Sequence, residues 1–198
     1  MSAVFAWWVI DHDAGTEWGG GSYDTPTYMA STSKPWLAQD ALTLLVPERN
    51  IEGMIRDSDN AAATRLAARL GITATMGRLA FTCGLKTLQP PYTSWSRSLM
   101  STRDMAHMID CISEPRVLVW MTQIRGYGQF GVWTLMPGVI VKNGWMEWGG
   151  TWYVNCLGRG QGWSIAVTVQ FPSAGYWWDD GFAEGQRRCN AGLTQLIL

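Results

Sequence analysis

Ser31-Thr32-Ser33-Lys34, Ser58-Asp59-Asn60 and Lys142-Asn143-Gly144 carry the strongest signal in this chain of 198 residues. These stretches contain two of the three lysines, Lys34 and Lys142, in a chain with 15 lysines and arginines in total. Arginine keeps its proton at any working pH, whereas a desolvated lysine can release it. The pattern therefore indicates that Lys34 and Lys142 stand where a titratable or compact cation is needed.

Ser31 and Lys34 are three residues apart at the start of a helix predicted over residues 32–46, so their side chains share one face. A serine hydroxyl becomes a good nucleophile when a nearby base takes its proton, and a buried lysine beside another cation can be that base. The start of a helix also favours an oxyanion. Taken alone, the pattern fits equally well an N-cap serine followed by an exposed lysine.

The other two stretches also have plain structural readings. Ser58-Asp59-Asn60 precedes an alanine-rich helix predicted from Asn60 to Leu70, and alone it could be a helix cap. Lys142-Asn143-Gly144 ends a predicted strand, and alone it could be a turn. In this order, each on its own element, the three stretches together predict one catalytic site.

This set of motifs resembles the serine β-lactamases and penicillin-binding proteins, including D-alanyl-D-alanine carboxypeptidases. The segment 55–62 around Ser58 and the segment 101–106, Ser-Thr-Arg-Asp-Met-Ala, also look like family segments. Val141-Lys142-Asn143-Gly144-Trp145 is similar to an actinobacterial-type variant. The resemblance spans nearly the whole chain and suggests a short member of actinobacterial or actinophage type.

The resemblance implies a role for each matching residue. Ser31 would be the nucleophile that accepts the acyl group, and Lys34 its general base. Ser58 would pass a proton to the leaving nitrogen, while Lys142 would hold Ser58 and attract a substrate carboxylate. The remaining implied contacts are an oxyanion hole from the backbone N–H groups of Ser31 and Trp145, and substrate binding by Asn60, Asn143 and Gly144.

The chain also departs from the family. Class A β-lactamases use a loop glutamate for deacylation, but no Asp or Glu occurs from Asn60 to Arg103, where six cations stand instead. Slow deacylation of β-lactams and a peptidase-like site are therefore expected. The short gap from Ser31 to Ser58 predicts a reduced helical lobe, and Asn143 replaces the usual Thr or Ser, although an amide can still donate to a carboxylate.

The order of predicted elements is strands, helices, strands and a closing helix, which indicates an α+β fold. We expect a β-lactamase/transpeptidase-like single domain over 1–198, in which one antiparallel sheet from both chain ends is flanked by helices. The sheet lobe would cover about 1–45 and 126–198, and a reduced all-helical lobe about 46–125 would be inserted. The strand predicted at 163–169 is a near-continuous apolar run and should be central in the sheet.

Composition limits the other possibilities. Hydrophobic residues make up 47% and the net charge is -1, which favours a packed core and gives no reason to expect nucleic acid. No apolar run reaches the roughly 18 residues of a membrane span. The four widely spaced cysteines favour free buried thiols over a metal site, with one or two disulfides as the alternative. No cofactor is expected, and the 13 tryptophans fit core packing, with Trp145 and Trp148 as candidates for lining a groove.

The expected function is an acyl-serine hydrolase of D-Ala-D-Ala carboxypeptidase type that acts on peptidoglycan stem peptides and is acylated by β-lactam-like small molecules. A true β-lactamase or an esterase is the enzymatic alternative. A catalytically weak peptidoglycan-binding or structural virion protein is the other. The N-terminus reads as a strand without a basic signal-peptide region. We therefore expect delivery outside the cell as a virion component, with tail proteins as possible partners, or otherwise a cytoplasmic location.

Overall fold

The computed structural model describes residues 4–90 and 92–197, and its centre is a five-stranded antiparallel sheet. The strand order is β2-β1-β7-β6-β5, so the chain ends supply adjacent strands and β7 is central, as predicted. The strands are β1 (Val4–Asp11), β2 (Thr16–Gly21), β5 (Ile140–Trp148), β6 (Thr151–Gly160) and β7 (Trp163–Pro172). The predicted α+β fold is confirmed.

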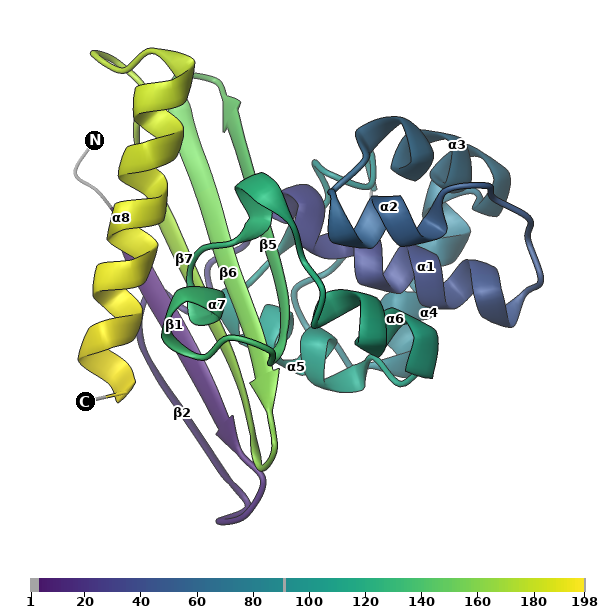
Figure 1. Cartoon of the computed structure of the whole chain (residues 1–198), viewed down its shortest axis with the longest axis horizontal. Helices are drawn as coiled ribbons and strands as arrows, with labels where there is room; N and C mark the ends of the chain where they lie inside the picture. The colour runs from purple at the N-terminus through teal and green to yellow at the C-terminus, as the bar shows by residue number, and fades with distance from the viewer. Residues whose placement is uncertain (1–3, 91, 198) are drawn as a thin grey trace.

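Helices cover the sheet on both sides. Helix α8 (Trp178–Ile197) packs against β6 and β7, and α5 (Thr102–Cys111) packs against β1, β6 and β7. Figure 1 shows α8 to the left of the sheet and the helices α1, α2, α3, α4 and α6 to the right. Although α5 falls within the range 46–125 expected to be the helical lobe, it belongs by its contacts to the sheet.

The helical lobe surrounds α1 (Lys34–Thr43). It consists of α2 (Ile51–Arg56), α3 (Asn60–Leu70), α4 (Ile72–Thr82) and α6 (Pro115–Met121). Helix α3 has the predicted bounds because Asp59 caps it, accepting hydrogen bonds from the backbone N–H groups of Ala61 and Ala62. The remaining elements are β3 (Thr27–Tyr28), η1 (Ala30–Ser33), β4 (Leu99–Met100), η2 (Gly126–Gly128) and α7 (Val132–Leu135).

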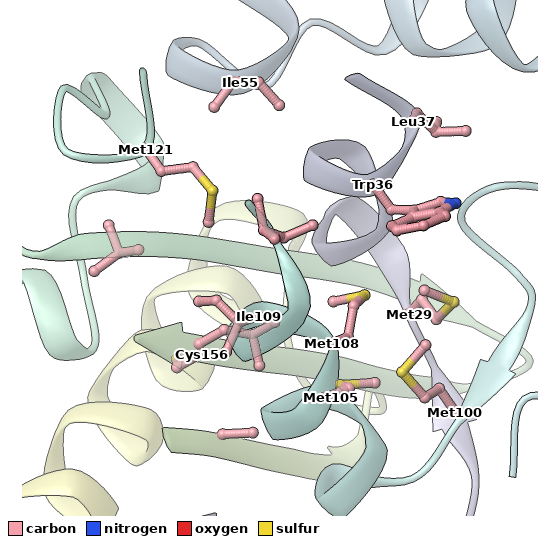
Figure 2. Packing of buried hydrophobic residues seen from close by; sticks show 14 of the residues in the cluster. Met29, Trp36, Leu37, Ile55, Met100, Met105, Met108, Ile109, Met121 and Cys156 are labelled. Carbon is pink, nitrogen blue, oxygen red and sulfur yellow. The ribbon is translucent and has the colours of Figure 1, made fainter. Parts of the chain in front are cut away.

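One hydrophobic cluster runs from the helical lobe to the sheet. Figure 2 shows Met105 and Met108 of α5 close to Met29, Met100 and the ring of Trp36. Methionine fills irregular gaps well because its side chain is unbranched and polarisable. This continuous packing fixes α1 against the sheet, and so fixes the two motifs that these elements carry relative to each other.

The cysteines are bonded in two pairs, Cys83–Cys111 and Cys156–Cys189. The preference for free thiols was therefore wrong, and the disulfide alternative holds. Pairing requires Cα atoms close in space, here 5.7 and 6.6 Å apart. Sequence separations of 28 and 33 residues gave no sign of that proximity. None of the described helices has the length and apolar content needed to cross a bilayer.

Candidate active site

Four elements bring the three motifs to one point. Ser31 lies in η1, Lys34 begins α1, Ser58 lies in the turn between α2 and α3, and Lys142 lies in β5. Ser58 and Lys142 are 84 residues apart, yet Lys142 Nζ donates to Ser58 Oγ at 3.0 Å. The convergence that the sequence predicted for these side chains is present.

Lys34 is the centre of the hydrogen-bond network. Its side chain is fully buried, and its Nζ contacts the Ser58 carbonyl oxygen at 2.6 Å, Asn60 Oδ1 at 2.7 Å and Ser58 Oγ at 3.0 Å. Ser58 Oγ therefore lies 3.0 Å from the Nζ atoms of both Lys34 and Lys142. Among the described residues, no hydrogen bond joins Lys34 to Ser31, so Ser58 is the immediate partner of the lysine.

Both lysines are poised to titrate near neutral pH. Burial, helped by the charge of Lys142 and opposed by Asp59, lowers the pKa of Lys34 to about 6. Burial also lowers the pKa of Lys142 to about 7. Desolvation disfavours a charged amine, and a second cation nearby disfavours it further. Lys34 is thus the more readily neutral of the two, as a general base requires.

The backbone is strained beside two of the motif serines. Ala30, which precedes Ser31, has φ 49°, and Ser58 itself has φ 59°. Residues other than glycine rarely adopt this left-handed conformation, and it clusters at functional sites. Ser31 and Ser58 both line the same cavity.

Gly144 allows β5 to pass very close to the segment that carries Ser31. A Cβ atom on Gly144 would lie 2.7 Å from the backbone nitrogen of Ser31 and 2.9 Å from that of Thr32. Neither backbone atom can move far, because the amide of Asn155 on the next strand holds the carbonyls of Tyr28 and Met29 at 2.8 and 3.2 Å. β5 can therefore approach the Ser31 segment this closely only because Gly144 has no side chain.

Asn143 does not have the contact expected of it. Its side chain is 1% exposed, and its amide nitrogen donates to the carbonyls of Gly128 and Phe130 at 2.9 and 2.7 Å. Both amide hydrogens are used inside the protein, so none is left for a substrate carboxylate. The correction follows from strand geometry, because side chains alternate between faces and Lys142 already points at the site.

The motif residues surround a cavity of about 320 Å³. Ser31, Ser58 and Asn60 line it, as expected, and Trp145 forms part of its wall. Sequence reasoning missed the other lining residues, among them one acid, Asp57, and three aromatic residues, Trp95, Tyr127 and Trp178. Nothing in the sequence separated these aromatic residues from the other tryptophans and tyrosines, and Asp57 looked like an ordinary helix-surface acid.

The loop before β4, which contains no Asp or Glu, places the indole of Trp95 near Lys34. Lys34 Nζ lies 4.8 Å from the ring centroid of Trp95, whose Nε1 donates to Thr64 Oγ1 at 3.3 Å. The carboxylate that lines the cavity, Asp57, is paired with Arg125 at 3.2 Å. An indole can shield a cation and exclude water, but it cannot take a proton from water.

No protein-family model matches this chain, and no curated protein matches it by sequence. Many solved structures match it by fold. The L2 protein complexed with relebactam superposes with a TM-score of 0.72 at 13% identity, over 98% of this chain and 92% of that one. A β-lactamase from Xanthomonas campestris pv. campestris gives 0.71 at 15% identity, over 98% and 92%. The TLA-3 extended-spectrum β-lactamase gives 0.70 at 14% identity, over 99% and 94%.

Proposed function

We propose that this chain, which has the β-lactamase fold, is an acyl-serine hydrolase of D-Ala-D-Ala carboxypeptidase type. Its substrates would be peptidoglycan stem peptides, and β-lactams would acylate it as substrate mimics. The observation that carries the proposal is the position of Ser58 Oγ, 3.0 Å from each of two buried lysine amines, at the edge of the cavity that contains Ser31.

Neutral Lys34 accounts for all three of its contacts. Its two N–H groups donate to the Ser58 carbonyl and to Asn60 Oδ1, and its lone pair is left to accept a proton. The Ser58 hydroxyl can donate a hydrogen bond to that lone pair, and its oxygen can accept one from charged Lys142. When a substrate is bound, the Ser31 hydroxyl competes for the same lone pair and loses its proton as it attacks.

The acylation step then follows the residues in order. Ser31 Oγ forms a bond to the substrate carbonyl carbon, and its proton moves to Lys34. The negative charge on the carbonyl oxygen is met by the backbone N–H groups of Ser31 and Trp145. As the tetrahedral intermediate collapses, Ser58 gives its proton to the leaving nitrogen and regains one from Lys34. Losing one oxyanion donor typically costs about 3 kcal/mol.

Lys142 would provide the charge that selects the substrate. Lys142 is 1% exposed, and its Nζ lies 3.0 Å from Ser58 Oγ. A carboxylate on the leaving group, as in a terminal amino acid, would be attracted to this cation and would raise its pKa above the value of about 7 in the free protein. The substrate itself would thus keep Lys142 charged.

Deacylation should be slow with β-lactams. Trp95 stands beside Lys34 with its ring centroid 4.8 Å from Nζ, and no Asp or Glu occurs from Asn60 to Arg103. Fast hydrolysis would require a base to activate water next to the ester. This argues for a carboxypeptidase over a true β-lactamase, although structures of similar fold include β-lactamases.

Two disulfides favour a protein that functions outside the reducing cytoplasm. Peptidoglycan also lies outside the cytoplasm. Under the hypothesis of a virion protein, release from the virion is one route by which the chain would reach peptidoglycan. Finding the chain in purified virions would support that route.

Intact-mass spectrometry after incubation with benzylpenicillin tests the function. Wild type should gain the mass of one penicillin, and Ser31→Ala should gain none. Lys34→Arg keeps the charge but cannot act as a base, so it should acylate at least about 100-fold more slowly. Rapid multiple turnover of nitrocefin would favour the β-lactamase alternative. Equal peptidoglycan binding by wild type and Ser31→Ala, with no adduct on either, would favour the structural alternative.

A further inference from the structure

A second cavity, of about 570 Å³, lies beside the active site and is lined by an arginine that forms no ion pair with the residues that the structure describes. We call it the Arg97 groove, and its lining includes Tyr28, Thr93, Arg97, Leu99 and Trp148. The same three chain segments line both cavities. Ala30, Ser96 and Met146 face the active-site cavity, whereas the neighbouring Tyr28, Arg97 and Trp148 face the groove.

Hydrogen bonds join two of these segments, and the stacking of Arg97 on Trp148 brings the third against them. The backbone N–H groups of Met29 and Ala30 donate to the carbonyls of Ser98 and Ser96 at 3.1 and 2.8 Å. Tyr28 pairs with Leu99 in the small β3–β4 sheet. The groove is therefore the extension of the active site along the end of strand β5, on the side away from Ser58.

Arg97 is the single charged residue among the described residues that line the groove. Ten of the arginines at described positions form ion pairs, and only Arg49 and Arg97 form none. The Arg97 guanidinium carbon lies 4.7 Å from the ring centroid of Trp148, which is 46% exposed. Stacking leaves the edge of the guanidinium, with its N–H donors, open to a ligand.

The backbone of Arg97 is held in place. Its N–H donates to Ser94 Oγ at 3.0 Å, and its carbonyl accepts from Thr93 Oγ1 at 3.1 Å. The Ser98 backbone and hydroxyl both donate to the Ser94 carbonyl, at 3.0 and 2.7 Å. The loop thus presents a preorganised cation, which reduces the entropy lost on binding.

We propose that the Arg97 groove binds an acidic acyl chain: the part of the substrate that stays on Ser31 carries a carboxylate, which Arg97 holds. This deepens the proposed function and rests on it, because it names the chemistry of the acyl donor. Guanidinium pairs with carboxylate through two parallel hydrogen bonds, and Trp148 would cover the aliphatic part of the chain. Lys142 would bind the carboxylate of the leaving group, so the two cations would bind carboxylates at opposite ends of the substrate.

The test compares matched donors. Cephalosporins acylated with linear dicarboxylic acids of three lengths (succinyl, glutaryl and adipoyl) are paired with their terminal primary amides, which have the same shape without the charge. The second-order rate of acylation of Ser31 is measured by intact mass. We expect at least one acid to react roughly 10-fold faster than its amide with wild type.

Variants assign the preference to the groove. Arg97→Gln should bring the acid-to-amide ratio to about one, and Arg97→Lys should retain part of it. Trp148→Ala should also lower the ratio, because the guanidinium loses its support. Arg49→Gln should keep the wild-type ratio. Arg49 is the other arginine without an ion pair among the described residues, and it is exposed in the turn before α2, far from the groove in sequence. Added salt should reduce the ratio in wild type and leave it unchanged in Arg97→Gln.

The possible failures are distinguishable. If benzylpenicillin acylates Ser31 but every acid reacts no faster than its amide, the groove proposal is overturned and the proposed function stands. If no donor acylates Ser31, the proposed function fails, and binding of glutaryl-7-aminocephalosporanic acid to Ser31→Ala is measured by calorimetry. Loss of that binding in Ser31→Ala/Arg97→Gln would support the groove. Equal or absent binding in both would overturn it.

Discussion

Lys34 Nζ lies against the indole of Trp95, 4.8 Å from the ring centroid. The lysine that should start acylation is therefore shielded from water on this side by an aromatic ring. Under the proposed function, Ser31 and Lys34 would form the acyl-enzyme, whereas the segment from Asn60 to Arg103 offers no carboxylate that could help to hydrolyse it.

Replacing Trp95 by glutamate should shorten the lifetime of the penicillin adduct. A carboxylate at this position could activate water, and general bases contribute about 100-fold or more to such steps. We expect the adduct to decay about 10-fold faster in this variant than in wild type, as followed by mass spectrometry. Trp95→Gln is the matched control, since it opens the same space without adding a base. Equal decay in both variants would contradict the role given to Trp95.

Acylation should have a narrow optimum near neutral pH. Lys34, with a pKa of about 6, must be neutral, so the rate rises as pH increases through 6. Lys142, with a pKa of about 7, must be charged, so the rate falls as pH increases further. The measurement is the rate of adduct formation between pH 5 and 9 with a neutral donor.

Lys142→Arg sharpens the pH test. Arginine stays protonated throughout the range, so the fall at high pH should disappear, even if the rate at the optimum is lower. A fall that persists in this variant would show that Lys142 is not the group that titrates on the alkaline side.

Lys142 should also make stability depend on pH. In the unfolded chain its pKa returns to roughly 10.4, whereas burial lowers the pKa to about 7 in the folded protein. Between these values the unfolded state binds more protons, so the free energy of unfolding rises with pH, by at most about 1.4 kcal/mol per unit for this lysine. Urea unfolding at pH 7 and pH 9 measures the slope.

Lys142→Met is the matched variant for that slope. Methionine is similar in length to lysine but has no amine to desolvate. The variant should therefore show a smaller pH dependence and a higher stability at pH 7, and it should lose activity. A slope between pH 7 and pH 9 equal to that of wild type would mean that Lys142 is not desolvated in solution as the structure indicates.

Gly144→Ala should abolish acylation by displacing the Ser31 segment. A methyl group 2.7 Å from the Ser31 nitrogen must push β5 and η1 apart, and overpacking of this kind costs typically about 1–3 kcal/mol. Circular dichroism should show a folded protein with a lower melting temperature and no penicillin adduct. Gly77→Ala, in α4 where a Cβ would meet nothing within 4 Å, controls for loss of a glycine as such. It should acylate normally.

Each disulfide should stabilise the fold by about 3 kcal/mol, since each closes a loop of roughly 30 residues. Cys83→Ser/Cys111→Ser unlinks α4 from α5, and Cys156→Ser/Cys189→Ser unlinks β6 from α8. Denaturant unfolding of both variants, and of wild type with reductant, should show lower midpoints. Unchanged midpoints together with free thiols detected in untreated wild type would contradict the pairing.

Much of the architecture was predictable because it is written in local patterns. The Asn60–Leu70 helix was predicted at its observed bounds, since an aspartate cap and a terminal glycine mark its ends. The central position of β7 followed from its continuous apolar run. Boundaries failed where two local geometries compete, as at residues 30–33, which form a 3₁₀ turn before α1 begins.

The sequence by itself determined the candidates for the reacting groups: Ser31, Lys34, Ser58 and Lys142 are singled out by residue type and spacing, and the lack of an acid between Asn60 and Arg103 could be counted. Only the tertiary structure decided how these groups act. Burial and mutual charge set the two lysine pKa values, and neither exists before the chain folds. Strand alternation turned Asn143 inward, proximity in space paired the cysteines, and the packing of three distant segments placed Arg97 against Trp148 beside the site. Chemistry is carried by single residues, whereas desolvation and proximity are properties of the whole fold.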